Sequence, residues 1–151
     1  MIKLILADMD GTLLPFGSRV ISERTHQAIL SALAAGISFG PASGRDYVDL
    51  ADAFDGDARC FSTGIMANGK KVFSSGELVF KKTLSTEALV KLEGAVRPYA
   101  GTSLWLVADA DETGMRCEQF LCGVEPDDEF ALGVVEDSGR DMAPGDVPTN
   151  R

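Results

Sequence analysis

The sequence has little of several features that mark specialised classes of protein. Its 151 residues include one histidine and three cysteines. No apolar run approaches the roughly 20 residues that a membrane-spanning helix needs. Cys60, Cys117 and Cys122 are odd in number and form no CxxC pair, which favours free thiols in a reducing cytoplasm over a disulfide framework or a zinc site. A disulfide between Cys117 and Cys122 is the alternative.

A basic surface is also lacking. The net charge is −9, and residues 1–85 carry nine basic and nine acidic side chains, so the whole acidic excess falls in residues 86–151. This balance argues against a nucleic-acid partner, because such proteins present lysine and arginine to the phosphate backbone. We interpret the acidic excess as a solubilising surface, and its uneven distribution predicts two regions.

The first 84 residues alternate between strand and helix signals. The apolar run Ile2–Ala7 is typical of a strand buried in a parallel sheet. Ser22 and Gly36 bracket a helix as N-cap and stop. A second strand is expected over residues 37–42, with its ladder interrupted at Gly40 and Pro41. Asp46 is expected to cap a helix to about Phe54, followed by a strand over 60–66 and a hairpin over 71–80. This order predicts an α/β fold with a doubly wound parallel sheet.

The pattern changes after residue 84. A helix is expected over residues 86–97, capped by Ser85 and ended by Pro98. Strands are expected over 102–108 and 115–122. From residue 137 onward, glycine, proline and scattered charges predict an irregular or disordered tail. The predicted organisation is therefore a core region over 1–84, a second region over 85–136, and a tail over 137–151.

The segment Asp8-Met9-Asp10-Gly11-Thr12, directly after the first predicted strand, is typical of a catalytic site. In an open α/β sheet the ligand crevice lies at the carboxyl ends of the strands. Two carboxylates so close together attract a divalent cation, and hard oxygen ligands suit Mg²⁺. Gly11 permits a tight turn beside them. An ordinary strand-to-helix turn is the alternative, which the glycine, the hydroxyl and the position together disfavour.

With the apolar Leu13 and Leu14 after it, this segment resembles the first motif, DxDGT, of the haloacid dehalogenase superfamily. The resemblance implies a Mg²⁺-dependent phosphatase that hydrolyses small phosphorylated metabolites, most often sugar phosphates, through an aspartyl-phosphate. Asp8 matches the nucleophile, and Asp10 matches the general acid that later activates water. Thr12 matches the residue that steadies the loop. The carboxylate of Asp8 and the backbone carbonyl of Asp10 would hold the metal.

The resemblance extends to the second motif and to the Cof-type branch of the superfamily. Ser43, in Pro41-Ala42-Ser43-Gly44-Arg45, matches the hydroxyl residue that binds a phosphoryl oxygen, with Gly44 beside it. Arg45 either reaches the phosphate or ends a helix in solvent. Asn68 either faces the substrate or supports the turn with Gly69. Residues 1–84 carry the motifs and 85–135 match by pattern, which implies a HAD-like (Rossmann-like) partial parallel sheet with helices on both faces and a partial α+β cap.

Two parts of the family site are not found. A lysine and an acidic GDxxxD-like turn normally follow the cap, and the segment 145–150 has no strand before it. Lysines in or beside the hairpin are expected at a solvated edge; these are Lys70, Lys71, Lys81 and Lys82. The chain is therefore expected to be a fragment of a longer enzyme, with an exposed apolar edge at Ile2–Ala7 that favours self-association.

Other functions stay open at this point. A phosphomutase shares the first motif, a fragment could bind only magnesium or phosphate, and a generic α/β binding module would not need Asp8. The sequence contains neither a Walker-type loop nor an HExxH motif. His26 lies on the apolar face of its predicted helix and is expected to be a packing residue.

Overall fold

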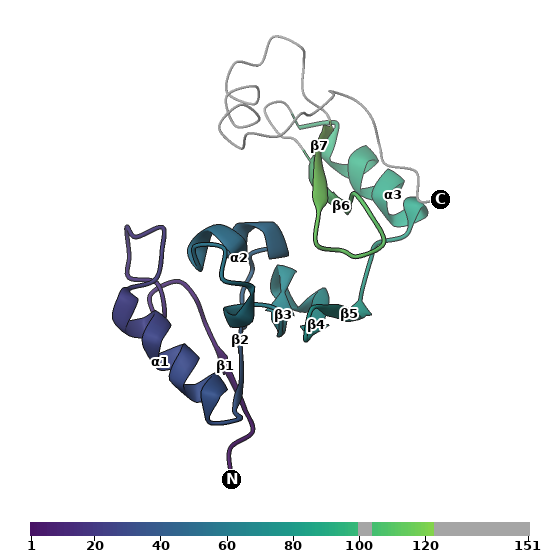
Figure 1. The fold of residues 1–151 in the computed structure, drawn as a ribbon. Coiled ribbons are helices and arrows are strands. Elements are labelled where there is room, and N and C mark those ends of the chain that lie inside the picture. The colour runs from purple at the N-terminus through teal and green to yellow at the C-terminus, as the bar shows by residue number, and fades with distance from the viewer. Residues whose placement is uncertain (100–103, 123–151) are drawn as a thin grey trace. The chain divides into compact units, whose positions relative to one another are not determined.

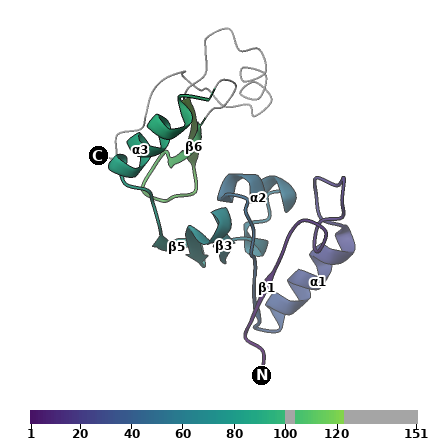
Figure 2. The ribbon, with the colours of Figure 1, turned by 180° about the vertical axis from the view of Figure 1, so that it is seen from behind.

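A computed structural model of the chain describes residues 1–99 and 104–122, the last five of these by their backbone alone. The chain divides into two compact units. One contains Met1–Lys82 together with Thr113–Met115, and the other begins at Thr83. The front and back views, in Figure 1 and Figure 2, show helices and strands in both units. The boundaries expected from the sequence at residues 84 and 136 stay a prediction, and residues 123–151 lie outside the described part.

The first unit begins with a parallel crossover. β1 (Leu4–Ala7) pairs in parallel with β2 (Ser38–Pro41), and α1 (Glu23–Ala34) connects them. The cap predictions for α1 are confirmed, since the Ser22 hydroxyl accepts from the Thr25 N–H at 3.1 Å. Gly36 follows the helix at φ +77°, in the left-handed region that glycine adopts without strain.

The interruption expected at Gly40 and Pro41 is absent on the β1 side. The ladder runs through Pro41, which lies opposite Ala7. Ser38 and Ala42 donate their N–H groups to Lys3 and Ala7, so alternate residues of β2 bond to β1. The Pro41 nitrogen therefore lies on the other edge, where its missing N–H removes no bond to β1. On that edge an isolated bridge between Ala42 and Ile65 joins the residue after β2 to β3.

The remaining strands of this unit form an antiparallel sheet. β3 (Gly64–Met66) pairs with β4 (Lys71–Ser74), which pairs with β5 (Glu77–Lys81). The predicted hairpin is confirmed. Its turn residues, Ser75 and Gly76, both have positive φ, the conformation of the type I′ turns that suit the twist of two-residue hairpins.

Short helices complete the unit around one hydrophobic core. α2 (Tyr47–Ala53) begins with a capping box between Asp46 and Asp49, and 3₁₀ turns form η1 (Ala58–Cys60) and η2 (Ala67–Gly69). The core gathers buried side chains from α1, β2, α2, η1, β3, β4 and the loops between elements: Met9, Leu14, Ile21, Ile29, Phe39, Leu50, Ala53, Phe54, Cys60, Phe61, Met66 and Phe73.

Lys71 is buried, and the expectation of a solvated edge is wrong for this residue. Its side chain is 8 % exposed, and its ammonium donates to both Asp46 oxygens at 2.9 and 3.0 Å and to the Gly114 carbonyl at 3.1 Å. A charge can be buried only when it is paired and hydrogen-bonded in this way. The other three lysines of the hairpin are exposed.

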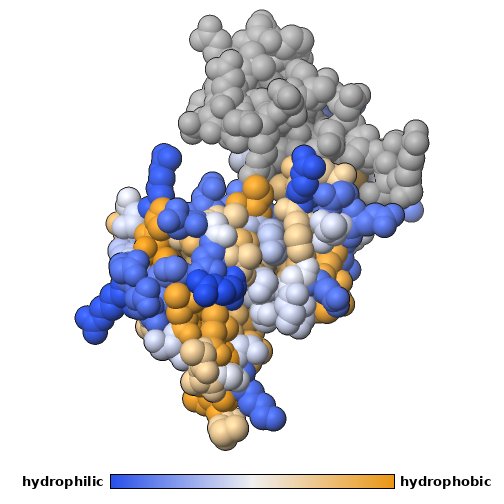
Figure 3. All heavy atoms as spheres, in the orientation of Figure 1, coloured by the Kyte–Doolittle hydropathy of each residue, from blue (hydrophilic) through white to orange (hydrophobic). Residues whose placement is uncertain are grey.

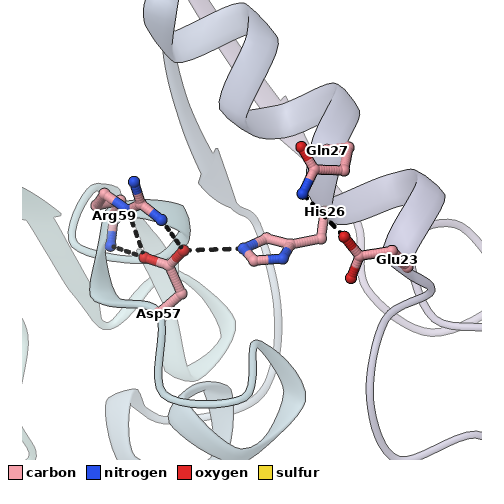
Figure 4. A network of polar contacts seen from close by, with 5 residues as sticks. All are labelled: Glu23, His26, Gln27, Asp57 and Arg59. Carbon is pink, nitrogen blue, oxygen red and sulfur yellow. Dashed lines mark hydrogen bonds and ion pairs between the residues drawn. The ribbon is translucent and has the colours of Figure 1, made fainter.

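His26 is more than a packing residue, which corrects the sequence-based expectation. Its Nε2 lies 2.8 Å from the Asp57 carboxylate, and its side chain is 24 % exposed. Figure 4 shows the imidazole reaching from α1 toward Asp57, which also binds Arg59. The apolar face of the helix did not reveal this contact because Asp57 is 31 residues away in the chain.

The second unit contains a helix and a strand pair. α3 (Thr86–Val96) begins at the N-cap Ser85, and its Leu89 packs with Leu104 and Leu106. β6 (Leu104–Asp109) pairs antiparallel with β7 (Cys117–Cys122). Cys117 is a thiol and takes no part in a disulfide. None of the described helices combines the length and apolar character needed to cross a membrane.

Candidate active site

The parallel pairing of β1 and β2 brings the first two motifs to one edge. Ala7 and Pro41 lie opposite each other as the last residues of their strands. The Ala42 N–H donates to the Ala7 carbonyl at 2.8 Å. Asp8 and Ser43 therefore leave the sheet side by side, at the carboxyl ends where α/β sheets bind their ligands.

Backbone hydrogen bonds join the end of β3 and the turn after it, residues 65–68, to the loop after β2, residues 43–45. Ser43 donates its N–H to the Ile65 carbonyl at 2.9 Å, and Asn68 donates its N–H to the Ser43 carbonyl at 3.1 Å. Ala67 donates to the Arg45 carbonyl at 2.9 Å. Asn68 has φ +56°, a left-handed conformation that asparagine tolerates better than most residues. The two loops are thus held together before any ligand binds.

These segments surround an open depression of ≈ 390 Å³. Its lining includes four of the predicted site residues: Asp8, Ser43, Gly44 and Asn68. Ala42, Ile65 and Gly69 complete it. A Cβ atom on Gly44 would lie 3.0 Å from Asn68 Oδ1, so the absence of a side chain at Gly44 lets the Asn68 amide lie this close.

The loop after β1 is a compact turn anchored by two buried side chains. The Met9 carbonyl accepts from the N–H groups of Thr12 and Leu14 at 3.2 and 2.8 Å, and the side chains of Met9 and Leu14 are buried in the core. Gly11 has φ +82°, and a Cβ there would lie 2.9 Å from the Phe16 ring. Thr12 takes part through its backbone, and it does not line the depression.

Arg45 contacts Asp10. Its Nη2 lies 2.8 Å from Asp10 Oδ1, and its Nε donates to Oδ2 at 3.4 Å. This hydrogen bond lowers the pKa of Asp10, and Asp10 in turn raises the pKa of Arg45. The sequence placed both residues at strand ends but did not reveal the pair. The signal that could have predicted this pair is the presence of opposite charges directly after two neighbouring parallel strands.

The oxygen atoms around Asp8 fit part of a magnesium shell. The Asp8 carboxylate is exposed and lines the depression. Within the described residues, no backbone N–H donates to the Asp10 carbonyl oxygen, which leaves that oxygen available. Mg²⁺ prefers such oxygen donors and usually keeps several waters. Arg45 binds the Asp10 carboxylate. The donors that suit the ion are therefore the Asp8 carboxylate and the backbone carbonyl oxygen of Asp10.

Comparisons with known proteins give one consistent family. The sequence profile of the haloacid dehalogenase-like hydrolases matches residues 5–116, well over half of the chain. No curated protein matches the sequence significantly. One similar solved structure is a phosphatase of the haloalkanoate (HAD) enzyme superfamily from Bacteroides thetaiotaomicron. It has 25% identity and a TM-score of 0.67, over 97% of this chain and 50% of that one.

Two further structures share the fold at lower identity. A protein from Eubacterium rectale has 22% identity and a TM-score of 0.74, over 99% of this chain and 54% of that one. A HAD subclass IIB sugar phosphatase has 20% identity and a TM-score of 0.63, over 89% of this chain and 48% of that one. This chain therefore spans about half the length of the solved structures that it matches. On the profile match and the arrangement of Asp8, Asp10 and Ser43, the chain belongs to the haloacid dehalogenase-like hydrolase family.

Proposed function

We propose that this protein is a cytoplasmic, Cof-type phosphatase that uses Mg²⁺ to hydrolyse small phosphorylated metabolites, with sugar phosphates as the substrate class. The observation that carries the proposal is the shared depression, where Asp8, Ser43 and Asn68 meet at the carboxyl ends of β1 and β2. The similar structures support it, because one is described as a HAD phosphatase and another as a sugar phosphatase.

In the first step, the Asp8 carboxylate attacks the phosphorus atom, and an aspartyl-phosphate forms as the bond to the leaving oxygen breaks. Asp10 gives its proton to that oxygen. The Ser43 hydroxyl already accepts from the Arg45 N–H at 3.1 Å, so its own O–H is free to donate to a phosphoryl oxygen. The Asn68 amide can donate to a second oxygen.

In the second step, Asp10 takes a proton from a water molecule, which attacks the phosphorus and releases inorganic phosphate and the Asp8 carboxylate. Ser43 and Asn68 keep the phosphoryl group in place through both steps. When bound, Mg²⁺ neutralises charge on the phosphoryl oxygens and orients the group for attack.

Arg45 has a specific part in this scheme. Asp10 must hold a proton in the first step, yet its pairing with Arg45 favours the ionised carboxylate. The pair is exposed at the surface, and exposed ion pairs are weak because solvent screens them. We therefore propose that the arriving phosphoryl group draws Arg45 away from Asp10. Arg45→Ala is expected to raise KM about tenfold or more, and Arg45→Lys by less, in steady-state kinetics.

The decisive experiment is phosphate release from p-nitrophenyl phosphate and from a panel of sugar phosphates, with Mg²⁺ and with EDTA. Asp8→Asn is expected to remove activity by on the order of 10⁴-fold or more, because the variant lacks the nucleophile. Asp52→Asn, an exposed acid on α2, is the matched control and should keep full activity. Equal rates for the two variants would contradict the proposal.

Two outcomes would favour the alternatives, since the whole protein's activity is inferred from a chain half as long as the structures it matches. Binding of Mg²⁺ or inorganic phosphate without turnover would indicate a binding function. Transfer of phosphate between positions of a sugar, stimulated by a bisphosphate, would indicate a phosphomutase.

We also propose that a second copy of this chain pairs with the free edge of β1. Within the described residues β1 pairs with β2 alone, and its side chains are largely exposed. An apolar edge strand with free N–H and C=O groups favours pairing with another strand. Sedimentation, described below, tests this proposal.

A further inference from the structure

A second cluster of reactive side chains lies in the first unit, and none of its members lines the depression. His26 comes from α1, Asp57 precedes η1, and Cys60 ends η1. One potential ligand atom from each of the three residues lies within 4.8 Å of the other two. A nitrogen, an oxygen and a sulfur donor from two separate elements therefore converge at one point.

We propose that His26, Asp57 and Cys60 form a binding site for a divalent transition-metal ion, with Zn²⁺ as the best match. Imidazole, carboxylate and thiolate are the three ligand types that zinc sites use. A neutral imidazole, one carboxylate and one thiolate carry two negative charges, which balance the charge of the ion. A neutral complex suits a partly buried place, where an unbalanced charge would be costly.

The geometry requires small adjustments. Bonds of about 2.0–2.3 Å to Zn²⁺ hold ligand atoms roughly 3.3–3.6 Å apart in a tetrahedral site. His26 Nε2 and Asp57 Oδ2 are now 2.8 Å apart and must separate slightly. The three ligand atoms lie within 4.8 Å of one another, so a pair near that distance must move about 1 Å closer. Side-chain rotations can supply both changes. The fourth position would be filled by water, because the cluster offers three protein ligands.

The surroundings permit this rearrangement. Arg59 holds both Asp57 oxygens at 2.7–2.8 Å, but its side chain is 68 % exposed and can turn into solvent at little cost. Figure 4 shows Glu23 and Gln27 beside His26 on α1, bonded to each other. They leave the imidazole directed at Asp57.

The Cys60 thiol distinguishes a metal site from a purely structural ion pair. An ion pair of His26, Asp57 and Arg59 needs no sulfur atom. Burial raises the pKa of the Cys60 thiol to about 11, so without a metal this thiol stays protonated at neutral pH. A bound metal must displace that proton, and thiolate ligation can then be observed directly.

The test is a titration of the purified chain with Co²⁺, a spectroscopic substitute for Zn²⁺. We expect one equivalent to produce a thiolate-to-cobalt charge-transfer band in the near ultraviolet, and Zn²⁺ to displace it. Cys60→Ala should lose the band, and His26→Gln should weaken Co²⁺ binding by at least tenfold. Cys117→Ser, which removes another thiol, should keep the band. An Asp8→Asn background excludes ions bound at the phosphatase site.

A second measurement does not depend on the folding of any variant. His26 is the single histidine of the chain, so every imidazole signal in an NMR spectrum comes from this residue. Stoichiometric Zn²⁺ is expected to shift its ring nitrogen signals, and Mg²⁺ should leave them unchanged. Absence of the charge-transfer band in the wild-type chain, or ring signals that do not respond to Zn²⁺, would overturn the proposal.

Discussion

Lys70 and Lys71 are neighbours in the chain with opposite environments. Lys70 is exposed, whereas the ammonium of Lys71 is enclosed by the Asp46 carboxylate and the Gly114 carbonyl. Because charges alternate along the hairpin, the sequence predicted that both lysine side chains would be exposed to solvent. The difference arises from the position of each side chain on β4 and from an acid 25 residues earlier, which a local pattern does not reveal.

Lys71→Met is expected to lower the free energy of unfolding by about 3–5 kcal/mol, because it leaves the Asp46 carboxylate buried without its cation. Lys70→Met is the matched control and should change it by less than about 0.5 kcal/mol. Urea denaturation of the two variants measures the difference. Similar losses in both would contradict the structural role of the buried pair.

The Asp57 carboxylate predicts a dependence of stability on pH. Its bonds to Arg59, and to a lesser extent to His26, hold its pKa well below the ordinary value of 3.8. A carboxyl with a lowered folded-state pKa stabilises the fold above its ordinary value and loses that contribution as the pH falls toward the folded-state pKa. At pH 6 the wild-type chain should therefore have a higher free energy of unfolding than Asp57→Asn. The difference between the two should become smaller below about pH 4. A pH series of urea denaturations tests this, and a gap that stays constant would contradict it.

At the scale of elements, local signals predicted helices well. Ser22, Asp46 and Ser85 were expected as N-caps, and each caps its helix, because capping depends on a few consecutive residues. The same local signals predicted the ends of strands less accurately. A strand was expected over residues 60–66, but η1 ends at Cys60 and β3 covers only Gly64–Met66, since strand length depends on distant partners.

Gly40 determines how closely β2 approaches the segment before β3. A Cβ at this position would overlap the Thr63 carbonyl, so Gly40→Ala must push the two segments apart. We expect a loss of about 1–3 kcal/mol in unfolding free energy, together with reduced phosphate binding as Ser43 and Asn68 separate.

Gly94→Ala is the matched control for that substitution. Gly94 lies within α3 and has open space around it, so alanine should stabilise the helix by about 0.5–1 kcal/mol. Thermal denaturation and isothermal titration with inorganic phosphate measure both effects. An unchanged phosphate affinity in Gly40→Ala would show that this approach does not position the site.

At the scale of the whole molecule, hydrophobic side chains remain exposed along β1. Figure 3 shows hydrophobic surface toward the N-terminal end of the chain. Leu4, Ile5 and Leu6 are 37–48 % exposed. Monomeric proteins usually blunt such an edge with charges or cover it.

Sedimentation velocity over a range of concentrations is expected to show reversible dimers or larger species of the wild-type chain. Leu6→Lys should shift the distribution toward monomer, because it places a charge on the free strand. Val90→Lys, on an exposed position of α3, should not. Monomeric wild-type chain at high concentration would contradict self-association.

The sequence by itself determined the family, the α/β order of elements and the residues of the two motifs, because these depend on short segments such as Asp8–Thr12 and Ser43–Arg45. Tertiary structure decided which of these residues meet. The pairing of β1 with β2 placed Asp8 beside Ser43, and it brought Arg45 to Asp10, 35 residues away.

The same holds for Lys71 with Asp46 and for His26 with Asp57 and Cys60. Contacts between distant residues depend on strand register and helix packing. Those features arise from the burial of the whole core and are not encoded in any single stretch of the chain.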